Sequence, residues 1–259
     1  MISELLGVPP EDYARFGAWS AALARSLDPE FLLPDREIAA RDAARVEFAG
    51  YFRELIERRR AEPADDLLSA LVAVSADGDA LSEEELVATC ILLLIAGHET
   101  TVNLIAGGTL ALLRHPAELK WFRSHPEHAA AAVEELLRYD PPVQLTMRSA
   151  LEDVPLAGTL VQRGQPVLML IGAANRDPAF FADPDRLDLT RYTGDRPAPG
   201  HLAFGHGIHF CLGAPLARLE GRIALSRLME REVTPAWSEL AYRDNLILRG
   251  LAALPVTLA

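Results

Sequence analysis

The residues best suited to chemistry lie in one glycine-rich stretch, residues 204–213, which holds Cys211, two histidines and three glycines. Beyond it, Leu216, Leu219 and Ile223 recur at helical spacing, so a helix is expected to follow. A thiol just ahead of a helix is close to the free N–H groups and partial positive charge of the helix start, which favour the thiolate. Glycines also let the chain approach a flat partner closely. Cys211 is therefore a candidate ligand or nucleophile.

Two other interpretations of Cys211 stay open. The first is a buried structural cysteine, which is common, but it leaves the glycines and histidines of the same stretch unexplained. The second is a zinc ligand acting with His206 and His209. No Cys-x-x-Cys or second histidine pair lies nearby to complete a tetrahedral zinc site.

The stretch from Phe204 to Gly213 resembles the haem-binding loop of the cytochrome P450 family. The positions that carry the resemblance are Phe204, Gly205, Gly207, His209, Cys211 and Gly213. The resemblance implies that these residues bind haem b and that Cys211 is the axial ligand of its iron, where a thiolate pushes electron density into the metal and favours O–O cleavage. It also implies that Arg148 and His209 bind the haem propionates, as cationic or hydrogen-bonding groups do.

A long apolar helix is predicted upstream. Ser82 and Glu85 form a capping box that opens it, and Pro116 stops it after about His115. At 1.5 Å per residue this helix would be roughly 50 Å long. Polar residues interrupt its apolar run, Leu86 to Gly97, before the length of about 20 residues that spans a membrane. A core helix is therefore the preferred interpretation.

The centre of this helix reads Ala96-Gly97-His98-Glu99-Thr100-Thr101, and buried polar groups of this kind are costly unless they have partners. One interpretation is a kink or a packing site for another helix. The pattern also resembles the central oxygen-binding helix of the cytochrome P450 family. That resemblance implies that Ala96 and Gly97 border the haem, that Glu99 and Thr100 relay protons to dioxygen, and that His98 packs or contacts substrate.

Glu135 and Arg138 are three residues apart on another predicted helix, and taken alone they would be an ordinary surface ion pair. They resemble the Glu-x-x-Arg pair of the same family, which a later arginine completes. We expect Arg186 to be that arginine. The resemblance implies a buried structural network of the three behind the Cys211 loop, without a chemical role.

The remaining pattern indicates a mainly α fold with a minor antiparallel β portion. Short β-prone runs separated by glycine turns occupy residues 151–170, and Asp77-Gly78-Asp79 predicts a further turn. The resemblance implies a single cytochrome P450-like haem domain over residues 1–259 that lacks the N-terminal portion of the family.

Composition excludes several classes of function. The chain of 259 residues has a net charge of −12 and one lysine, Lys120, so neither a basic nucleic-acid surface nor a Gly-Lys-Ser/Thr phosphate loop is present. Its two cysteines, Cys90 and Cys211, indicate no disulfide framework. The first residues lack the pattern of a signal peptide. A cytoplasmic protein is expected.

The resemblance implies a monooxygenase that inserts one oxygen atom of O₂ into a small apolar substrate, in natural-product metabolism. Electrons would come from NAD(P)H through ferredoxin reductase and ferredoxin, and Arg218 and Arg222 could meet an acidic electron donor. Two rival interpretations stay open. One is a truncated, non-catalytic relative that assists another enzyme, and the other is a truncated product without a stable fold.

Overall fold

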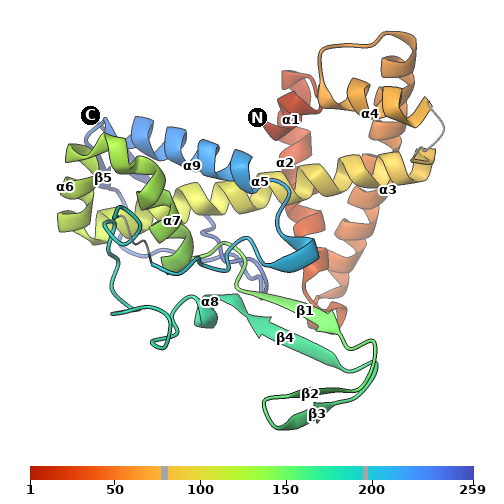
Figure 1. Ribbon diagram of the computed structural model, residues 1–259. Helices are drawn as coiled ribbons and strands as arrows, with labels where there is room; N and C mark the ends of the chain where they lie inside the picture. The colour runs from red at the N-terminus through yellow and green to blue at the C-terminus, as the bar shows by residue number, and fades with distance from the viewer. Residues whose placement is uncertain (77–80, 195–197) are drawn as a thin grey trace. The chain divides into compact units, whose positions relative to one another are not determined.

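The computed structural model describes residues 1–76, 81–194 and 198–259, and the predicted turn at Asp77–Asp79 lies outside them. The chain is mainly helical, with short strands (Figure 1). The α-helices are α1 (Ile2–Leu5), α2 (Tyr13–Ala24), α3 (Asp35–Ala61), α4 (Leu67–Ala76), α5 (Glu83–Arg114), α6 (Pro116–Ser124), α7 (Ala129–Tyr139), α8 (Ile171–Ala174) and α9 (Ala214–Met229). Single 3-10 turns are η1 (Pro10–Asp12), η2 (Arg25–Leu27), η3 (Glu30–Leu32), η4 (Pro126–His128) and η5 (Gly207–His209).

The chain divides into two compact units, Met1–Thr100 and Thr101–Ala259, and the boundary falls inside α5. A boundary within one continuous helix does not decide how many domains fold independently. The single haem domain therefore stays a prediction.

An aromatic cluster forms the core of the first unit, where α2 and α3 pack side by side (Figure 1). Phe16 of α2 meets Phe48 of α3 edge to face, with ring centroids 5.0 Å apart. Trp19, Tyr51 and Phe52 complete the cluster. Edge-to-face contact is the favoured geometry for aromatic pairs and adds to the stabilisation from burying their apolar area.

Helix α5 begins at the predicted capping box. The Ser82 N–H donates to Glu85 Oε2 (2.8 Å), and the Glu85 N–H donates back to Ser82 Oγ (3.3 Å). The helix ends at Arg114, shortly before Pro116, which has no N–H to continue the helical hydrogen bonds. Pro116 is instead the first residue of α6, where a missing N–H costs nothing.

By length and composition α5 passes the test for a membrane-spanning helix, as core helices of other proteins also do. Leu86, Leu94, Leu104 and Leu112 are fully or almost fully buried in protein, which favours the core interpretation. Helix α5 is not buried on every side, however, because Leu92 is 65% exposed.

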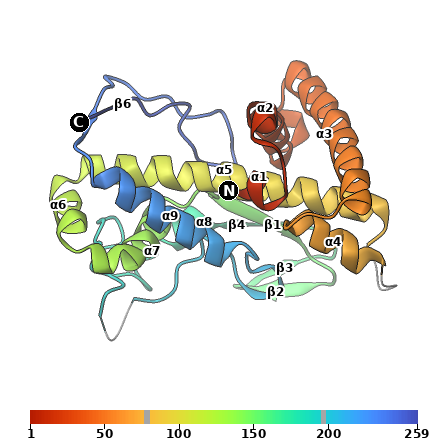
Figure 2. The same cartoon turned by 90° about the horizontal axis from the view of Figure 1, so that it is seen from above.

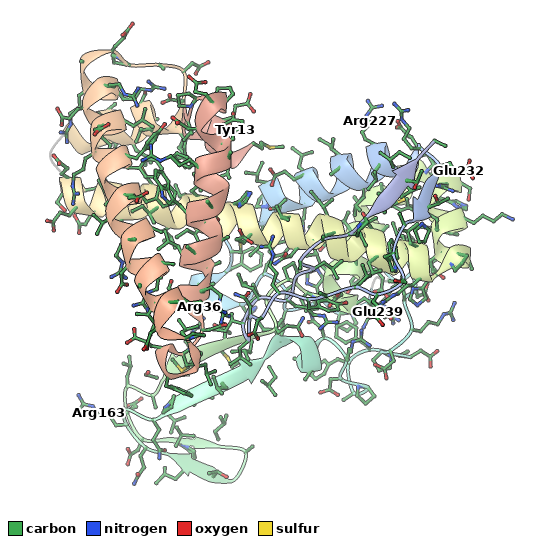
Figure 3. All side chains as sticks on the ribbon, turned by 180° about the vertical axis from the view of Figure 1, so that it is seen from behind. Tyr13, Arg36, Arg163, Arg227, Glu232 and Glu239 are labelled. Carbon is green, nitrogen blue, oxygen red and sulfur yellow. The ribbon has the colours of Figure 1, made fainter. Side chains whose placement is uncertain are left out.

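In the second unit, α9 lies beside α7 (Figure 2). A Cβ built on Gly221 of α9 would lie 3.0 Å from a methyl carbon of Leu104 on α5 and 3.4 Å from one of Val133 on α7. The glycine therefore lets three helices approach closely. Arg227 of α9, by contrast, is 77% exposed and extends into solvent (Figure 3).

The β portion consists of three antiparallel pairs among the described residues, as the sequence predicts. They are β1 (Leu145–Ser149) with β4 (Pro166–Leu170), β2 (Val154–Leu156) with β3 (Thr159–Val161), and β5 (Val233–Pro235) with β6 (Val256–Leu258). The β2–β3 turn is built on Ala157 and Gly158, which both have positive φ as a two-residue hairpin turn requires. This hairpin extends beyond the β1–β4 pair (Figure 1).

Replacing Phe16 by alanine is expected to destabilise the chain by about 3–5 kcal/mol, because it leaves a cavity in the aromatic cluster. Chemical unfolding followed by circular dichroism measures the loss. The matched control is Phe31→Ala, at a side chain that is 86% exposed, with an expected change within about 0.5 kcal/mol. Equal losses in the two variants would contradict this account of the core.

Candidate functional site

The Cys211 loop, residues 204–213, is closed by its own main chain. The Cys211 N–H donates to the Phe204 carbonyl (3.0 Å), and the Phe210 N–H donates to the Gly207 carbonyl (3.0 Å). Gly205 and Gly207 have φ values of +71° and +76°, a region that other residues rarely adopt. A Cβ on Gly207 would meet nothing within 4 Å, so its backbone angle, not packing, requires the glycine.

The loop presents a half-buried cysteine sulfur beside the start of a helix. Helix α9 begins at Ala214, whose N–H donates to the Cys211 carbonyl (3.2 Å). This confirms the predicted placement of Cys211 just ahead of a helix. The other cysteine, Cys90, is fully buried, and burial raises the pKa of its thiol to about 12. Of the two cysteines, Cys211 is the partly exposed one, and it lies beside a helix start.

Several side chains of the loop are both apolar and exposed. Ile208 is 98% exposed, and Phe210 and Leu212 of the same loop are also exposed, which for apolar residues marks a binding surface. Arg148 on β1 is exposed and donates only to Thr146 Oγ1 and the Met147 carbonyl, so among the described residues it forms no ion pair. His209 is exposed as well. The structure does not bring Arg148 into hydrogen-bond contact with the described residues of the loop.

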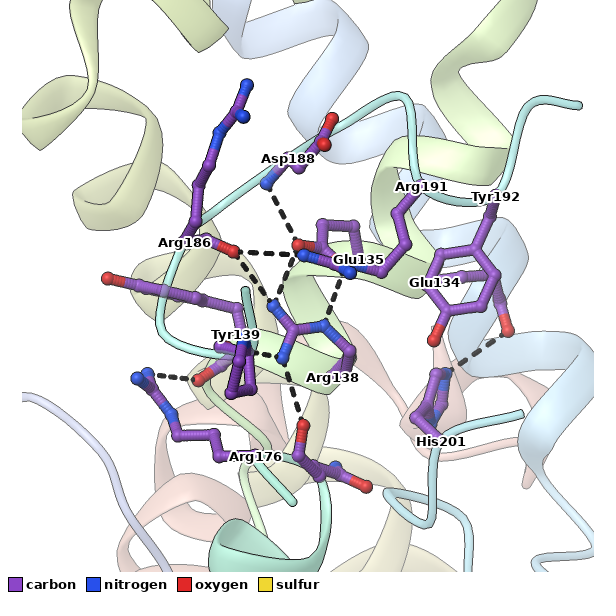
Figure 4. Close-up of polar contacts among 12 residues, drawn as sticks. Glu134, Glu135, Arg138, Tyr139, Arg176, Arg186, Asp188, Arg191, Tyr192 and His201 are labelled. Atoms are coloured by element: carbon purple, nitrogen blue, oxygen red, sulfur yellow. Dashed lines mark hydrogen bonds and ion pairs between the residues drawn. The ribbon is translucent and has the colours of Figure 1, made fainter. Parts of the chain in front are cut away.

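A buried guanidinium organises the chain behind the loop. Arg138 has no exposed side-chain surface, and its five N–H groups form five hydrogen bonds (Figure 4). Two go to the Glu135 carboxylate (2.7 and 2.8 Å), and the others go to the carbonyls of Asn175 (2.9 Å), Pro184 (2.8 Å) and Arg186 (3.0 Å). The predicted pair is therefore a buried network and not a surface ion pair.

The second guanidinium of this network is Arg191, and the prediction of Arg186 is wrong on this point. Arg191 Nε donates to Glu135 Oε2 (3.1 Å), and its Nη1 donates to the Ala182 carbonyl (2.7 Å). Arg186 contributes only its main-chain carbonyl, while its side chain is exposed (Figure 4). The sequence offers two arginines in one segment, and the path of the main chain decides which one turns inward.

Asn175 connects this network to the Cys211 loop, a role that sequence reasoning missed. It is fully buried, its carbonyl accepts from Arg138, and its side-chain Oδ1 accepts the Leu202 N–H (2.7 Å). The Leu202 carbonyl in turn accepts the Gly205 N–H (2.9 Å). The motif Ala174-Asn175-Arg176-Asp177 was a possible signal, since a buried asparagine needs partners.

A second carboxylate, Glu134, holds both flanks of the loop, and sequence reasoning missed it too. Arg218 donates two hydrogen bonds to it (2.7 and 2.9 Å), and His201 Nε2 lies 3.2 Å from its Oε2. Burial alone would raise the pKa of Glu134, but these hydrogen bonds and the nearby positive charge outweigh it and lower the pKa to about 2. Arg218 is thus already bound to a carboxylate, while Arg222 is exposed.

The predicted catalytic pair lies at the end of the first unit. Glu99 is 2% exposed, and its Oε1 lies 3.4 Å from Nδ1 of His98, which is also 3.2 Å from Ser20 Oγ. The Thr100 hydroxyl donates to the Ala96 carbonyl (2.6 Å), a bond within the helix that often bends it. A Cβ on Gly97 would lie 3.1 Å from Cγ1 of Ile2 in α1. This close approach of α1 matches the predicted packing site at Gly97. The neighbouring Ala96 is exposed.

Comparison with known proteins places this geometry in a family. A family model described as "Cytochrome P450" matches residues 21–120 and 127–232. The chain belongs to the cytochrome P450 family. The cysteine loop, the central helix and the Glu135–Arg138 pair all lie within the matched ranges, so the resemblance seen in the sequence is confirmed at the level of the family.

Individual relatives agree with this assignment. The chain is 49% identical to "Vitamin D(3) 25-hydroxylase" of Pseudonocardia autotrophica, with 100% of the chain and 62% of the relative covered. It is 44% identical to "Biotin biosynthesis cytochrome P450" of Bacillus subtilis, with 99% and 64% covered. The chain thus spans less than two thirds of the length of these P450s.

Solved P450 structures share the fold. P450BioI, crystallised with an acyl carrier protein ligated to hexadec-9Z-enoic acid, superposes with a TM-score of 0.92 at 43% identity, covering 100% of this chain and 65% of that one. CYP164A2 of Mycobacterium smegmatis superposes with a TM-score of 0.90 at 45% identity, covering 98% and 64%. The mainly α fold with a minor antiparallel portion is therefore a P450 fold.

Exchange of the two arginines tests the correction to the network. Arg191→Gln is expected to cost about 2 kcal/mol of unfolding free energy, because it removes a hydrogen bond to the buried Glu135 carboxylate. Arg186→Gln keeps the main-chain carbonyl and should change stability by no more than about 0.5 kcal/mol. Urea unfolding of both variants measures the difference, and the reverse order would restore Arg186 to the network.

The lowered pKa of Glu134 predicts how its contribution depends on pH. Its folded pKa, about 2, lies below the ordinary 4.5, so this group stabilises the fold above the ordinary value and stops doing so as pH falls through 2. The carboxylate contributes on the order of 3 kcal/mol at neutral pH. The unfolding free energy of the wild type should therefore exceed that of Glu134→Gln by roughly this amount at about pH 7. The difference between the two proteins should disappear by about pH 2. A gap that is constant over this range in urea unfolding would contradict the prediction.

Proposed function

We propose that the chain is the haem-bearing part of a haem-thiolate monooxygenase that inserts one atom of O₂ into a small apolar substrate. The observation that carries the proposal is Cys211, a half-buried sulfur beside the start of α9 in a P450-family chain. Relatives named as a vitamin D(3) 25-hydroxylase and as a 6-deoxyerythronolide B hydroxylase support this reaction class.

The residues present fit haem, although their roles toward it are proposals. Cys211 would ligate the iron as a thiolate, which the free N–H groups of the first turn of α9 favour. The exposed Ile208 and Phe210 would contact the apolar ring, and Phe204, Gly205 and Gly213 would shape the loop around it. Haem, when bound, supplies the activation of dioxygen, and the protein supplies binding, orientation and electrostatics.

The remaining site residues handle carboxylates and protons. Arg148 and His209 would bind the haem propionates, because their exposed side chains offer charge-assisted hydrogen bonds. Glu99 and Thr100 remain the proposed proton relay, and Ala96 and Gly97 the proposed border of the haem. The Thr100 hydroxyl donates to the Ala96 carbonyl. Its Oγ1 can still accept a hydrogen bond from another group.

The relatives' names bear on the substrate class. The relatives' names include vitamin D(3) and polyketide biosynthesis, which supports an apolar carbon skeleton as the substrate class. We assign the electron supply to NAD(P)H through ferredoxin reductase and ferredoxin, with the exposed Arg222 on the donor side, in a cytoplasmic enzyme.

The absorption spectrum of the haem-supplemented protein, reduced and exposed to carbon monoxide, tests the proposal. Wild type and Cys90→Ser are expected to give the strongly red-shifted Soret band of thiolate ligation, because Cys90 is buried away from solvent. Cys211→Ser should lose that band completely. If wild type takes up no haem, the monooxygenase proposal fails and the role of a non-catalytic partner of another enzyme replaces it.

A further inference from the structure

Glu134, His201 and Arg218 form a cluster that the reaction scheme does not use. The three side chains come from α7, from the chain ahead of the Cys211 loop and from α9 (Figure 4 shows the first two). His201 is 3% exposed at its side chain, and its Nδ1 accepts the Ala203 N–H (3.2 Å). An accepting Nδ1 leaves the proton on Nε2, which donates to Glu134. One carboxylate therefore receives three N–H bonds.

The cluster acts on the first residue of the loop. The Arg218 guanidinium carbon lies 4.6 Å from the centroid of the Phe204 ring, and the His201 ring centroid lies 5.9 Å from it. A guanidinium over an aromatic face is attracted by the ring and restricts its orientation. The carbonyl of the same Phe204 accepts the Cys211 N–H. The position of the Phe204 ring and the position of the Cys211 main chain are thus coupled.

Glu134 and the neighbouring Glu135 bind different segments of the chain, and only the segments bound by Glu134 flank the Cys211 loop. Glu135 binds Arg138, Arg191 and the Asp188 N–H, which fix the segment ahead of His201. Glu134 binds one residue before the Cys211 loop and one after it. Neighbouring positions on a helix point in directions about 100° apart, so these carboxylates reach different segments.

We propose that Glu134 and Arg218 are positioning residues that clamp the two flanks of the Cys211 loop, with His201, and hold Phe204 and the sulfur of Cys211 in place for iron ligation. The proposal rests on the proposed function for its iron, but the clamp itself is a property of the chain alone. Without it, the loop would keep its sequence and lose its fixed conformation.

Hydrogen–deuterium exchange of the full chain, before and after addition of haem, tests the clamp. In Glu134→Gln and in Arg218→Gln, peptides covering residues 204–211 should exchange about tenfold faster or more, because the charge-assisted hydrogen bonds that hold the two flanks of the loop are lost. Peptides covering the β1–β4 pair should keep their wild-type rates. The matched control is Arg227→Gln on the same helix, at a side chain that is 77% exposed, with no change in the loop.

The carbon monoxide spectrum of the reduced, haem-loaded variants gives a second readout. The fraction of haem with the red-shifted thiolate band should fall in Glu134→Gln and Arg218→Gln, and Arg218→Lys, which keeps the charge but not the two-pronged geometry, should restore part of it. If Glu134→Gln fails to fold, the comparison of Arg218→Gln with Arg218→Lys tests the clamp instead. Loop exchange equal to wild type in these variants overturns the clamp, even where wild type shows the thiolate band. Failure of wild type to bind haem overturns the proposed function alone, because exchange is also measured without haem.

Discussion

The buried charge of Arg138 is the constraint on which the rest of the second unit depends. An unpaired guanidinium in a protein interior costs several kcal/mol, so it is stable there only if its N–H groups are satisfied. All five are satisfied, by Glu135 and by three main-chain carbonyls from residues 175, 184 and 186. Those carbonyls belong to segments with no regular secondary structure of their own at these positions. Hydrogen bonds to Arg138 therefore hold these irregular segments in place, as hydrogen bonds to a neighbouring strand do in a sheet.

The Cys211 loop is closed by main-chain hydrogen bonds of its own, but its most exposed side chains add little to them. Ile208 and Leu212 are 98% and 87% exposed, so these two side chains contribute almost nothing to the stability of the loop, whereas Phe204 packs against the core of the second unit. The loop is also held from behind. Asn175 carries the Arg138 network to the Leu202 N–H, and Glu134 binds both flanks. The geometry of the sulfur and the stability of the unit are therefore linked.

Local features of the fold could be predicted from the sequence, since they depend on residues close in the chain. The capping box at Ser82 and Glu85, the stop before Pro116 and the helix after Cys211 all occur as expected. The Glu135–Arg138 pair is also local, three residues apart on one helix. The resemblance to P450s added the haem and the burial of that pair, which helical spacing alone does not give.

Long-range contacts could not be predicted in the same way. Spacing shows which side chains share a helix face, but not which arginine of an irregular segment turns inward. The resemblance therefore indicated Arg186, and the structure shows Arg191 bound to Glu135. Asn175 and Leu202 lie 27 residues apart, and Glu134 and Arg218 lie 84 apart. The packing of α7 against α9 sets the Glu134–Arg218 pair, and the path of irregular chain sets the Asn175–Leu202 pair; no sequence period encodes either.

The charges behind the loop also explain why Arg218 differs from the other two arginines. Arg138 and Arg191 both bind the buried Glu135, and their charges are largely taken up there. Arg218 balances Glu134, and in addition its guanidinium is influenced by the charge of Cys211; with Glu134 first, these groups raise its pKa. Arg218 therefore connects a carboxylate of α7 with the aromatic ring of Phe204, the first residue of the loop.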